Sequence, residues 1–331
     1  MTVTKMNTEL KLSGFARYAW FVLAYNIVVI LWGVVVRASL SGDGCGQFWL
    51  TCGGEVVPSA PQMKTVIEFS HRVTSGLAFV AVLVLLIWAF RRFAKGDLMR
   101  KMALASFGFI TIEALIGAVL VLFKLVALNP SMIRAFSMTA HLINTFVLLA
   151  VLTLTAWFAS GGRRFSISRR GKISWLLAIA VFGILLVSAS GSLAALSSTL
   201  FPSATLAEGL AKDFSETSHI LLRLRVSHPI LSISVGVFLI FLAGWIKSKA
   251  KESFWTNRWA NVLTVLVGVQ FLSGALTLLT LAPIVLQLIH LLLADAVWIA
   301  FVLMSASVLA EESFFAEAKF SAKAQRSLRE V

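Results

Sequence analysis

Long runs of apolar residues, separated by short polar segments, dominate the whole chain. A helix crosses the hydrocarbon core of a membrane, about 30 Å thick, with about 20 consecutive apolar residues. Because each run reaches about that length, the pattern predicts an all-α integral membrane protein with eight transmembrane helices. The predicted spans are residues 17–38, 63–91, 99–124, 132–159, 173–198, 216–246, 259–281 and 285–311.

The composition excludes an ordinary water-soluble domain. Of the 331 residues, 59% are hydrophobic and 13% are charged, whereas soluble domains are about half apolar and about a quarter charged. Disorder, a collagen-like chain and nucleic-acid binding are excluded by the same balance. The longest polar segments are two loops at about 39–62 and 199–215, so any chemistry must occur in or beside the bilayer.

The charges predict the orientation, because most basic residues fall on one side of the predicted spans. The opposite loops contain mainly Lys64, Lys124 and Lys212. By the positive-inside rule the basic side is cytoplasmic, so both termini are expected in the cytoplasm of a multi-pass protein of the cell inner (plasma) membrane. The polar start and the spanning length of the first apolar run predict no cleavable signal peptide. The residues on the basic side are Lys5, Lys11, Arg17, Arg91, Arg92, Lys95, Arg100, Lys101, Arg163, Arg164, Arg169, Arg170, Lys172, Lys247, Lys249, Lys251, Arg258, Lys319, Lys323, Arg326 and Arg329.

An internal repeat at an offset of about 157 residues relates the two halves of the chain. Glu113 matches Gln270 at this offset, and His71 matches His228. Because an even number of spans separates the copies, both halves are expected to have the same orientation, as in a parallel repeat. The two predicted four-helix bundles comprise residues 1–160 and 161–331.

Four histidines lie inside predicted spans, one on each even-numbered span: His71, His141, His228 and His290. At about 1.5 Å per residue, all four lie at similar depths in the outer half of the membrane. One such histidine is explained by an interhelical hydrogen bond, but four at matched depths favour metal ligation. Two imidazoles facing each other across a bundle can hold heme iron, whereas zinc or copper would need further ligands. His219, near the outer mouth of the sixth span, is predicted to be interfacial.

Glu68, His71 and Arg72 share one face of the second predicted span, at spacings of three and four residues. A carboxylate beside a heme edge is a candidate catalytic group. The alternative is that Glu68 and Arg72 form an ion pair that only hides two charges.

Several arginines lie near outer helix ends, where heme propionates need cationic partners. Snorkelling to lipid headgroups is the competing explanation for each of them. The candidates are Arg37, Arg72, Arg134, Arg223 and Arg225.

Cys45 and Cys52 are seven residues apart in a glycine-rich outer loop. An oxidising compartment permits a structural disulfide between them. A redox pair that exchanges electrons or thiols with a partner is the alternative.

The segment VVVRASLSGDGCGQFWLTCGGEVVP (Val34–Pro58), followed by IEFSHR (Ile67–Arg72), resembles the first outer loop and second helix of the heme A synthase family. With eight spans, a repeat and a histidine on every even span, the resemblance covers nearly the whole chain. It implies conversion of heme O to heme A, for cytochrome oxidase, by oxidation of a ring methyl to a formyl group through hydroxylated intermediates.

The resemblance also implies roles for individual residues. His71 and His141 would flank the substrate heme in a catalytic N-terminal half, where Glu68 would assist its oxidation. His228 and His290 would ligate a heme b cofactor in the C-terminal half. The implied partners are heme O synthase, cytochrome oxidase assembly proteins, membrane lipid and an electron donor of unknown identity.

Two positions depart from the expected pattern. Pro229 follows His228 where Arg72 follows His71, and Glu113 stands where a glutamine like Gln270 is expected. Two other functions would also use paired histidines. A diheme b-type membrane electron carrier would place its hemes near opposite membrane faces, and a non-catalytic heme-handling assembly protein would leave the Glu68 carboxylate without a role.

Overall fold

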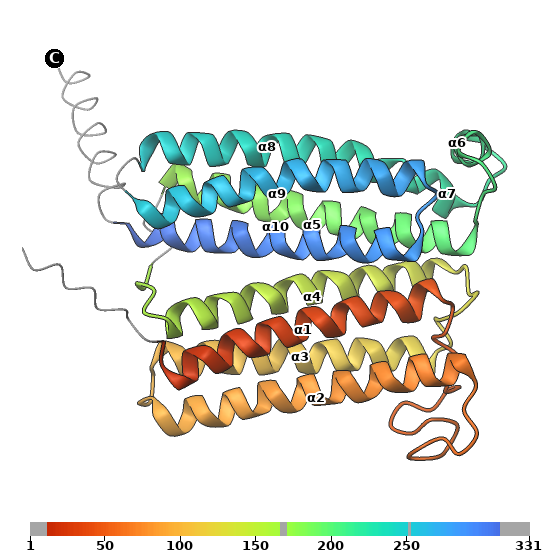
Figure 1. Cartoon of the computed structure of the whole chain (residues 1–331), viewed down its shortest axis with the longest axis horizontal. Coiled ribbons are helices and arrows are strands. Elements are labelled where there is room, and N and C mark those ends of the chain that lie inside the picture. Colours follow the sequence, from red (N-terminus) through yellow and green to blue (C-terminus); the bar gives the residue numbers. More distant parts are fainter. Residues whose placement is uncertain (1–11, 166–170, 251–252, 312–331) are drawn as a thin grey trace, which may run out of the picture.

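The structure is a computed structural model that describes residues 12–165, 171–250 and 253–311, and these form an elongated helical bundle (Figure 1). Eight helical segments in these ranges are long and apolar enough to cross a membrane, which confirms the predicted all-α fold with eight spans. The sixth span, Ile220–Lys249, is divided into two helices. The helices are α1 (Gly14–Ala38), α2 (Met63–Arg92), α3 (Leu98–Leu122), α4 (Met132–Ala159), α5 (Gly171–Leu200), α6 (Leu206–Phe214), α7 (Ile220–Arg225), α8 (Ser227–Lys249), α9 (Phe254–Leu279) and α10 (Ile284–Ala310).

Short polar side chains fix several helix starts. Ser13 accepts a hydrogen bond from Ala16 N at the start of α1, and Asp97 accepts one from Met99 N at the start of α3. Each cap satisfies a backbone N–H that has no partner within the helix. These two spans therefore begin where an apolar run follows a capping residue.

The sixth span is bent at Val226, between α7 and α8, although the sequence predicted one continuous helix over 216–246. Pro229 explains the break, because proline has no N–H to donate to the carbonyl of Arg225 four residues earlier. Ser227 Oγ instead donates to Leu224 O at 2.6 Å. The proline thus sets where α8 begins, one residue before His228.

Helix α6 lies within the segment 199–215, which the sequence analysis expected to be a loop. Its apolar side chains Leu206, Leu210 and Phe214 are exposed and four residues apart, as in an amphipathic helix at an interface. Lys212 forms an ion pair with Glu208 at 2.7 Å, and this hydrogen-bonded contact lowers the pKa of the Glu208 carboxyl. Nine residues are too few for a span, so the apolar-run criterion missed this helix.

The helices form two groups of spans that lie side by side, α1–α4 and α5 with α8–α10 (Figure 1). In the first group each helix packs on the next, and α1 packs on α4 to close the ring. In the second group α5 packs on α8, α8 on α9 and α9 on α10, but α5 and α10 make little contact. The two groups therefore differ in packing, and the predicted parallel repeat stays a prediction.

Helix α10 joins the two groups, because it packs on α9, α4 and α1. The indole N–H of Trp298 on α10 donates to Phe146 O on α4 at 2.6 Å, and the two rings are in contact. Nearly all residues from Val297 to Ala310 are buried. The centre of the hydrophobic core thus lies where α10 contacts the N-terminal group.

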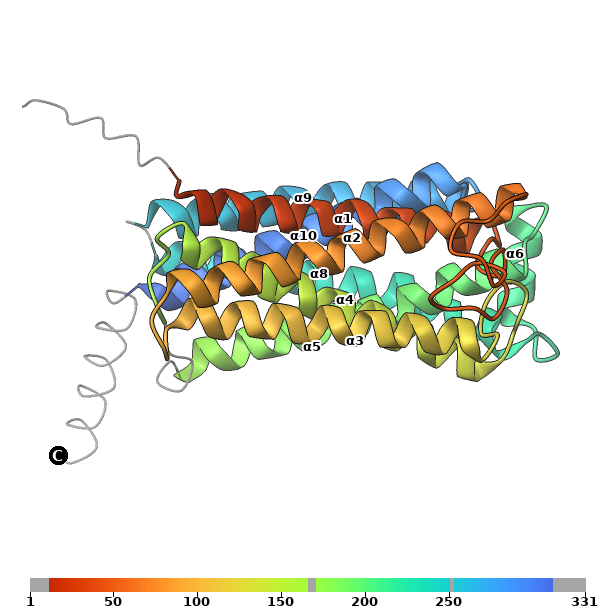
Figure 2. The same cartoon turned by 90° about the horizontal axis from the view of Figure 1, so that it is seen from below.

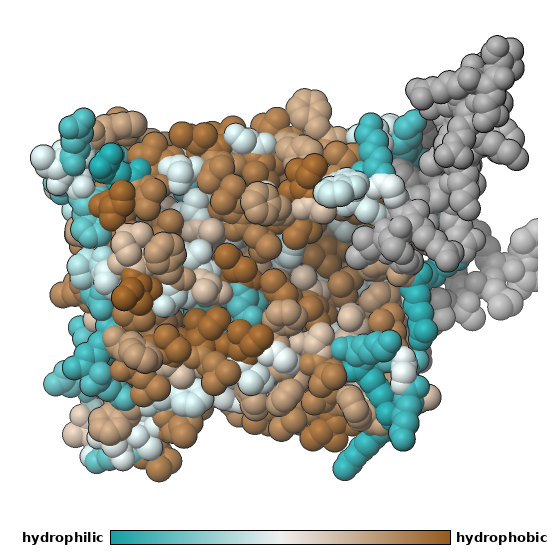
Figure 3. All heavy atoms as spheres, turned by 180° about the vertical axis from the view of Figure 1, so that it is seen from behind, coloured by the Kyte–Doolittle hydropathy of each residue, from teal (hydrophilic) through white to brown (hydrophobic). Residues whose placement is uncertain are grey.

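On the face shown in Figure 3, apolar residues cover the middle of the bundle, and polar residues gather at its two ends. The loop that contains Cys45 and Cys52 lies at one end with α6, here called the disulfide end (Figure 2). Helix α1 begins and α10 ends at the opposite end, here called the basic end. Among the predicted basic-side residues, Lys5, Lys11, Arg169, Arg170, Lys251, Lys319, Lys323, Arg326 and Arg329 lie outside the described residues.

Candidate functional site

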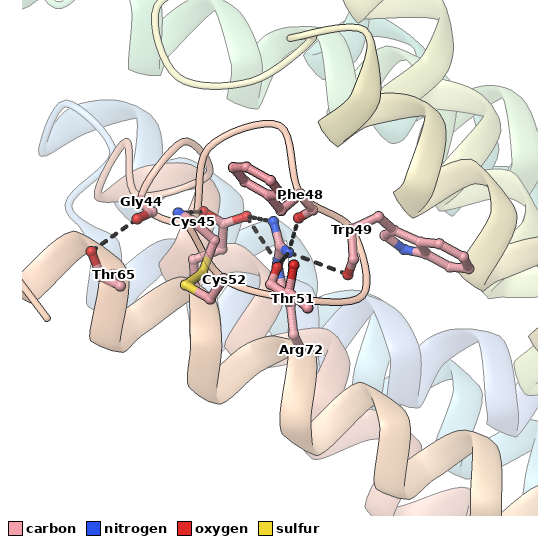
Figure 4. Close-up of polar contacts among 9 residues, drawn as sticks. Gly44, Cys45, Phe48, Trp49, Thr51, Cys52, Thr65 and Arg72 are labelled. Atoms are coloured by element: carbon pink, nitrogen blue, oxygen red, sulfur yellow. Dashed lines mark hydrogen bonds and ion pairs between the residues drawn. A yellow bond between two sulfur atoms is a disulfide. The ribbon is translucent and has the colours of Figure 1, made fainter. Parts of the chain in front are cut away.

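A disulfide between Cys45 and Cys52 closes the loop between α1 and α2 (Figure 4). The Cα atoms of the two cysteines are 4.3 Å apart, and both side chains are buried. Cys52 and Glu55 also form an isolated β-bridge within the loop. The predicted disulfide is thus confirmed as a structural feature, whereas a redox function for it stays a prediction.

Arg72 on α2 forms hydrogen bonds with the backbone of this loop. Its guanidinium donates to the carbonyl oxygens of Phe48, Trp49 and Thr51 and to Oε1 of Glu68 (Figure 4). The donor groups of Arg72 are therefore committed to neighbours within the α1–α2 loop and on α2.

Glu68 is 3% exposed and faces the same loop. Its Oε2 accepts a hydrogen bond from Cys45 N at 2.7 Å, and its Oε1 accepts from Arg72 at 2.5 Å. The ion pair considered as the alternative is therefore present, and the carboxylate also anchors the disulfide. Because the charge is paired and bonded, the cost of burying it is largely offset.

In the N-terminal group, His71 lies on α2 and His141 lies on α4. His71 Nδ1 is buried and has no hydrogen-bond partner among the residues that the structure describes. Gly33 on α1 leaves room for this ring, since a Cβ there would lie 3.3 Å from His71 Cε1. Glu113 Oε1 lies 3.4 Å from His141 Nδ1. Each histidine thus lies beside a residue of another helix of this group, Gly33 at His71 and Glu113 at His141, and their pairing around one ligand stays a prediction.

In the C-terminal group, the rings of His228 on α8 and His290 on α10 face each other edge to face, with centroids 6.3 Å apart. Ser190 Oγ lies 3.2 Å from His228 Nδ1, and Ser273 Oγ lies 3.4 Å from His290 Nδ1. The Nδ1 atoms of both rings are therefore in contact with serine hydroxyl groups. Gln270 Nε2 lies 3.3 Å from His290 Nε2 and also donates to His290 O.

Glycines leave space for both rings of this pair. A Cβ at Gly191 on α5 would lie 3.0 Å from His228 Cε1, and one at Gly274 on α9 would lie 3.2 Å from His290 Cε1. Gly33 and Gly191 thus play the same part beside the first histidine of each half.

Arg37, proposed from the sequence as a propionate partner, connects the two groups of helices. It donates to Ala195 O and Thr199 Oγ1 on α5, both at 2.8 Å, and to Gln287 Oε1 on α10 at 2.6 Å. These bonds all go to neutral oxygens, so the positive charge of Arg37 is not balanced by them.

Arg134, in the first turn of α4, is a second cation whose hydrogen bonds go to neutral oxygens. It is 2% exposed and donates to Ala127 O and Asn129 O, while its Nε has no hydrogen-bond partner in the described part of the chain. Arg134 is thus buried and Arg37 half-buried, and each has only neutral hydrogen-bond partners, so either cation would be stabilised by an anion.

The other predicted cationic residues differ from this pair. Arg225 forms an ion pair with Asp213 at 2.5 Å, which ties α7 to α6, whereas Arg223 borders a surface hollow beside Phe214. His219 caps α7 by accepting a hydrogen bond from Leu221 N. Arg72 and Arg225 are thus both neutralised by carboxylates.

The family model described as "Cytochrome oxidase assembly protein" matches residues 16–302, a range that encloses all four span histidines, Glu68 and both cysteines. The chain belongs to this family, which includes the heme A synthases. A heme A synthase of Alkalihalophilus pseudofirmus is 27% identical over 290 residues, which cover 84% of this chain and 92% of that protein. A heme A synthase of Halalkalibacterium halodurans is 37% identical over 130 residues, 38% of this chain and 42% of that protein.

Two proteins of Thermus thermophilus are each named protoheme IX farnesyltransferase. They match a larger share of this chain, at higher identity, than the two heme A synthases do. One is 45% and the other 44% identical over 297 residues, which cover 90% of the chain. The chain spans 49% of the length of each of these relatives. About half of each relative therefore lies outside the region that matches this chain.

Asp295 on α10 was not identified from the sequence. It is fully buried, and neither of its carboxylate oxygens has a hydrogen-bond partner among the described residues. It follows His290 by five residues on the helix shared by the two groups. An acidic residue inside an otherwise apolar span was the available signal.

Proposed function

We propose that this protein is a heme A synthase, which oxidises a ring methyl of heme O to the formyl group of heme A through hydroxylated intermediates, for use by cytochrome oxidase. The observation that supports this most is the extent of the family match, because residues 16–302 include both histidine pairs and the Glu68 loop. Converting a methyl to a formyl group removes four electrons and four hydrogen ions from the substrate and water, or uses O2 as the oxidant and releases water, so an external electron acceptor or O2 takes the electrons. The reaction thus needs a substrate site and a redox cofactor, and two histidine pairs provide one place for each.

His228 and His290 would hold the heme b cofactor. A nitrogen–metal bond is about 2.0 Å long, so two such bonds plus the half-widths of two imidazole rings are compatible with centroids 6.3 Å apart. The serine contacts at both Nδ1 atoms favour Nε2 as the ligand atom. Gln270 can keep its bond to His290 O when a metal takes Nε2. When bound, heme b would transfer electrons to and from the substrate site.

His71 and His141 would flank the substrate heme. The unpartnered Nδ1 of His71 supports this, because a buried polar atom without a partner is costly unless a ligand satisfies it. Arg37 and Arg134 are the best candidates to bind propionates, since their present partners are neutral. Arg72 and Arg225 are weaker candidates because a carboxylate already neutralises each of them.

Glu68 would act at the edge of the substrate heme. Its carboxylate can hold a proton or stabilise positive charge that develops on the oxidised ring. Arg72 and Cys45 N keep the group in place between α2 and the loop. The disulfide loop would cover the substrate and exclude water from this end of the N-terminal group.

A prenyltransferase that makes heme O is the proposed supplier of substrate. The Thermus relatives carry the name protoheme IX farnesyltransferase, yet the matched region makes up only 49% of their length. We assign the activity in that name to their unmatched part. Joining the two parts in one chain would pass heme O directly to the oxidising half, and a separate chain would need to dock beside such an enzyme.

The test is to express the full chain in a bacterial host that makes heme O but no heme A, and to identify the extracted hemes by mass. We expect heme A and its hydroxylated precursor in cells with the native chain, and heme O alone with His71→Ala. A folded protein that yields heme b and unmodified heme O would refute the proposal. A diheme electron carrier and a heme-handling protein both predict that result.

A further inference from the structure

The two histidine pairs differ in the group beside one histidine of each pair. On α3, Glu113 stands beside His141, whereas on α9 the equivalent Gln270 stands beside His290. The two positions are related by the repeat offset of about 157 residues. One half thus places a carboxylate, and the other an amide, against a candidate ligand.

Glu113 is held in position by the helix that carries His141. Its Oε2 accepts a hydrogen bond from Asn144 Nδ2 at 2.5 Å, and its Oε1 accepts one from the hydroxyl of Thr145. The Asn144 amide also donates to Phe109 O at 3.0 Å, which fixes it against α3. Because both carboxylate oxygens are acceptors, the contacts suit an ionised carboxylate.

The position of Glu113 Oε1 determines which ring nitrogen of His141 is available to bind a ligand. It lies 3.4 Å from Nδ1. Nδ1 has no hydrogen-bond partner among the described residues, but the negative charge at this distance favours the proton on Nδ1. The lone pair of Nε2 is then directed away from Glu113. A carboxylate beside Nδ1–H also makes an imidazole a more basic and more electron-donating ligand.

Gln270 cannot have the same effect on His290. Its Nε2 atom is the one that lies near the ring, at 3.3 Å from His290 Nε2, and the group on the Nδ1 side is the neutral hydroxyl of Ser273. Neither partner brings a negative charge to the ring. His290 is therefore the less electron-donating of the two histidines.

We propose that Glu113 is a positioning residue that orients His141 and makes it the stronger electron donor, so that the substrate heme has a lower reduction potential than heme b. The inference rests on the proposed function for the assignment of the two heme sites. Electron donation from an axial ligand favours the oxidised states of heme iron. The carboxylate would therefore direct oxidation to the heme of the N-terminal group.

The experiment uses the full-length protein purified with its hemes and measures the two midpoint potentials by spectroelectrochemistry. The variant Glu113→Gln removes the negative charge beside His141 Nδ1, and Gln270→Glu places a negative charge beside the His290 ring, on its Nε2 side. We expect Glu113→Gln to raise the potential of the N-terminal heme and leave heme b unchanged. Gln270→Glu should lower the potential of heme b. Loss of formyl product in Glu113→Gln should be about ten- to hundredfold, as for other groups that support a ligand.

Equal potentials in Glu113→Gln and the native protein would overturn the inference, whatever the activity. Glu113→Asp keeps the charge and should restore part of the native potential, which a role in packing alone does not predict. If the native protein makes no heme A but its potentials respond as described, the proposed function fails while this inference holds. If Glu113→Gln does not fold, Gln270→Glu decides, and an unchanged heme b potential would then count against the inference.

Discussion

At the scale of single residues, the most informative group is the carboxylate of Glu68, which has two partners of different kinds. Arg72 neutralises it, and Cys45 N binds it to the disulfide loop. The catalytic role proposed for Glu68 and its observed structural contacts therefore belong to the same side chain. The two roles can be tested separately. The proposed catalytic role requires an ionisable carboxyl group, whereas the bond from Cys45 N requires only an oxygen acceptor.

We expect Glu68→Gln to fold, retain heme b and accumulate heme O or a hydroxylated intermediate. The amide oxygen can still accept from Cys45 N, but it can neither carry the negative charge nor exchange a proton in the same way. Heme extraction and mass analysis provide the measurement. A full yield of heme A from this variant would eliminate the catalytic assignment.

The matched control is Arg72→Gln. It leaves the 3% exposed carboxylate of Glu68 without its cation, and breaking a buried pair in this way costs about 3–5 kcal/mol. We therefore expect a larger loss of thermal stability in detergent for Arg72→Gln than for Glu68→Gln. The opposite order would show that Glu68 is mainly a structural anchor.

The candidate site was predictable where spacing alone determined it. His71, His141, His228 and His290 were found because each lies on a separate span at a similar depth. The bonds of Arg37 were not predictable, since its partners follow it in sequence by 158, 162 and 250 residues. Such contacts depend on how helices pack, which a pattern along one chain does not encode.

At the scale of elements, glycines on neighbouring helices leave room for the histidine rings. We expect Gly191→Ala to lower heme b occupancy, because the new Cβ would lie 3.0 Å from the His228 ring. Gly244→Ala on α8 is the control, since it meets nothing within 4 Å. Both changes should favour their helices by about 1 kcal/mol, so unequal heme content, measured by pyridine hemochrome, isolates the contact. Equal occupancy in the two variants would contradict the prediction.

The disulfide is expected to stabilise the loop and not the spans. Non-reducing peptide mapping should recover Cys45 and Cys52 as one linked peptide, and free thiols at both would contradict the structure. Replacing both by serine should remove about 2–3 kcal/mol of local stability, as estimated for short closed loops. Hydrogen exchange should then accelerate within 46–57 while α2 is unchanged, because Arg72 still holds the base of the loop.

The observed helices show which helix ends the apolar pattern predicted correctly and which interruption it missed. Predicted ends such as 63–91 and 132–159 lie within one residue of Met63–Arg92 and Met132–Ala159. The break at Val226 was missed because Pro229 lies within the first turn of the second piece, where apolar periodicity continues unaltered. These boundaries followed hydrophobicity, whereas α9 begins at Phe254, five residues before the predicted start at 259. The interruption at Val226 depended on backbone chemistry.

At the scale of the whole molecule, the charge distribution predicts that the basic end faces the cytoplasm. In a protein whose cysteines are replaced by serine, Thr217→Cys lies at the disulfide end and Lys95→Cys at the basic end, and both positions are exposed. An impermeant maleimide added to intact cells should label position 217 and reach position 95 only after permeabilisation. The reverse pattern would overturn the orientation.

The bonds of Arg37 also determine when folding can finish. Gln287 is synthesised 250 residues after Arg37, which is roughly 12–50 s at about 5–20 residues per second. Until α5 and α10 have entered the bilayer, the Arg37 guanidinium lacks the partners it has in the final structure. During translation, α1 would therefore wait near the membrane surface or with the insertion machinery. Helix α1 is made before α5 and α10, yet it would reach its final position only after both of them have been inserted.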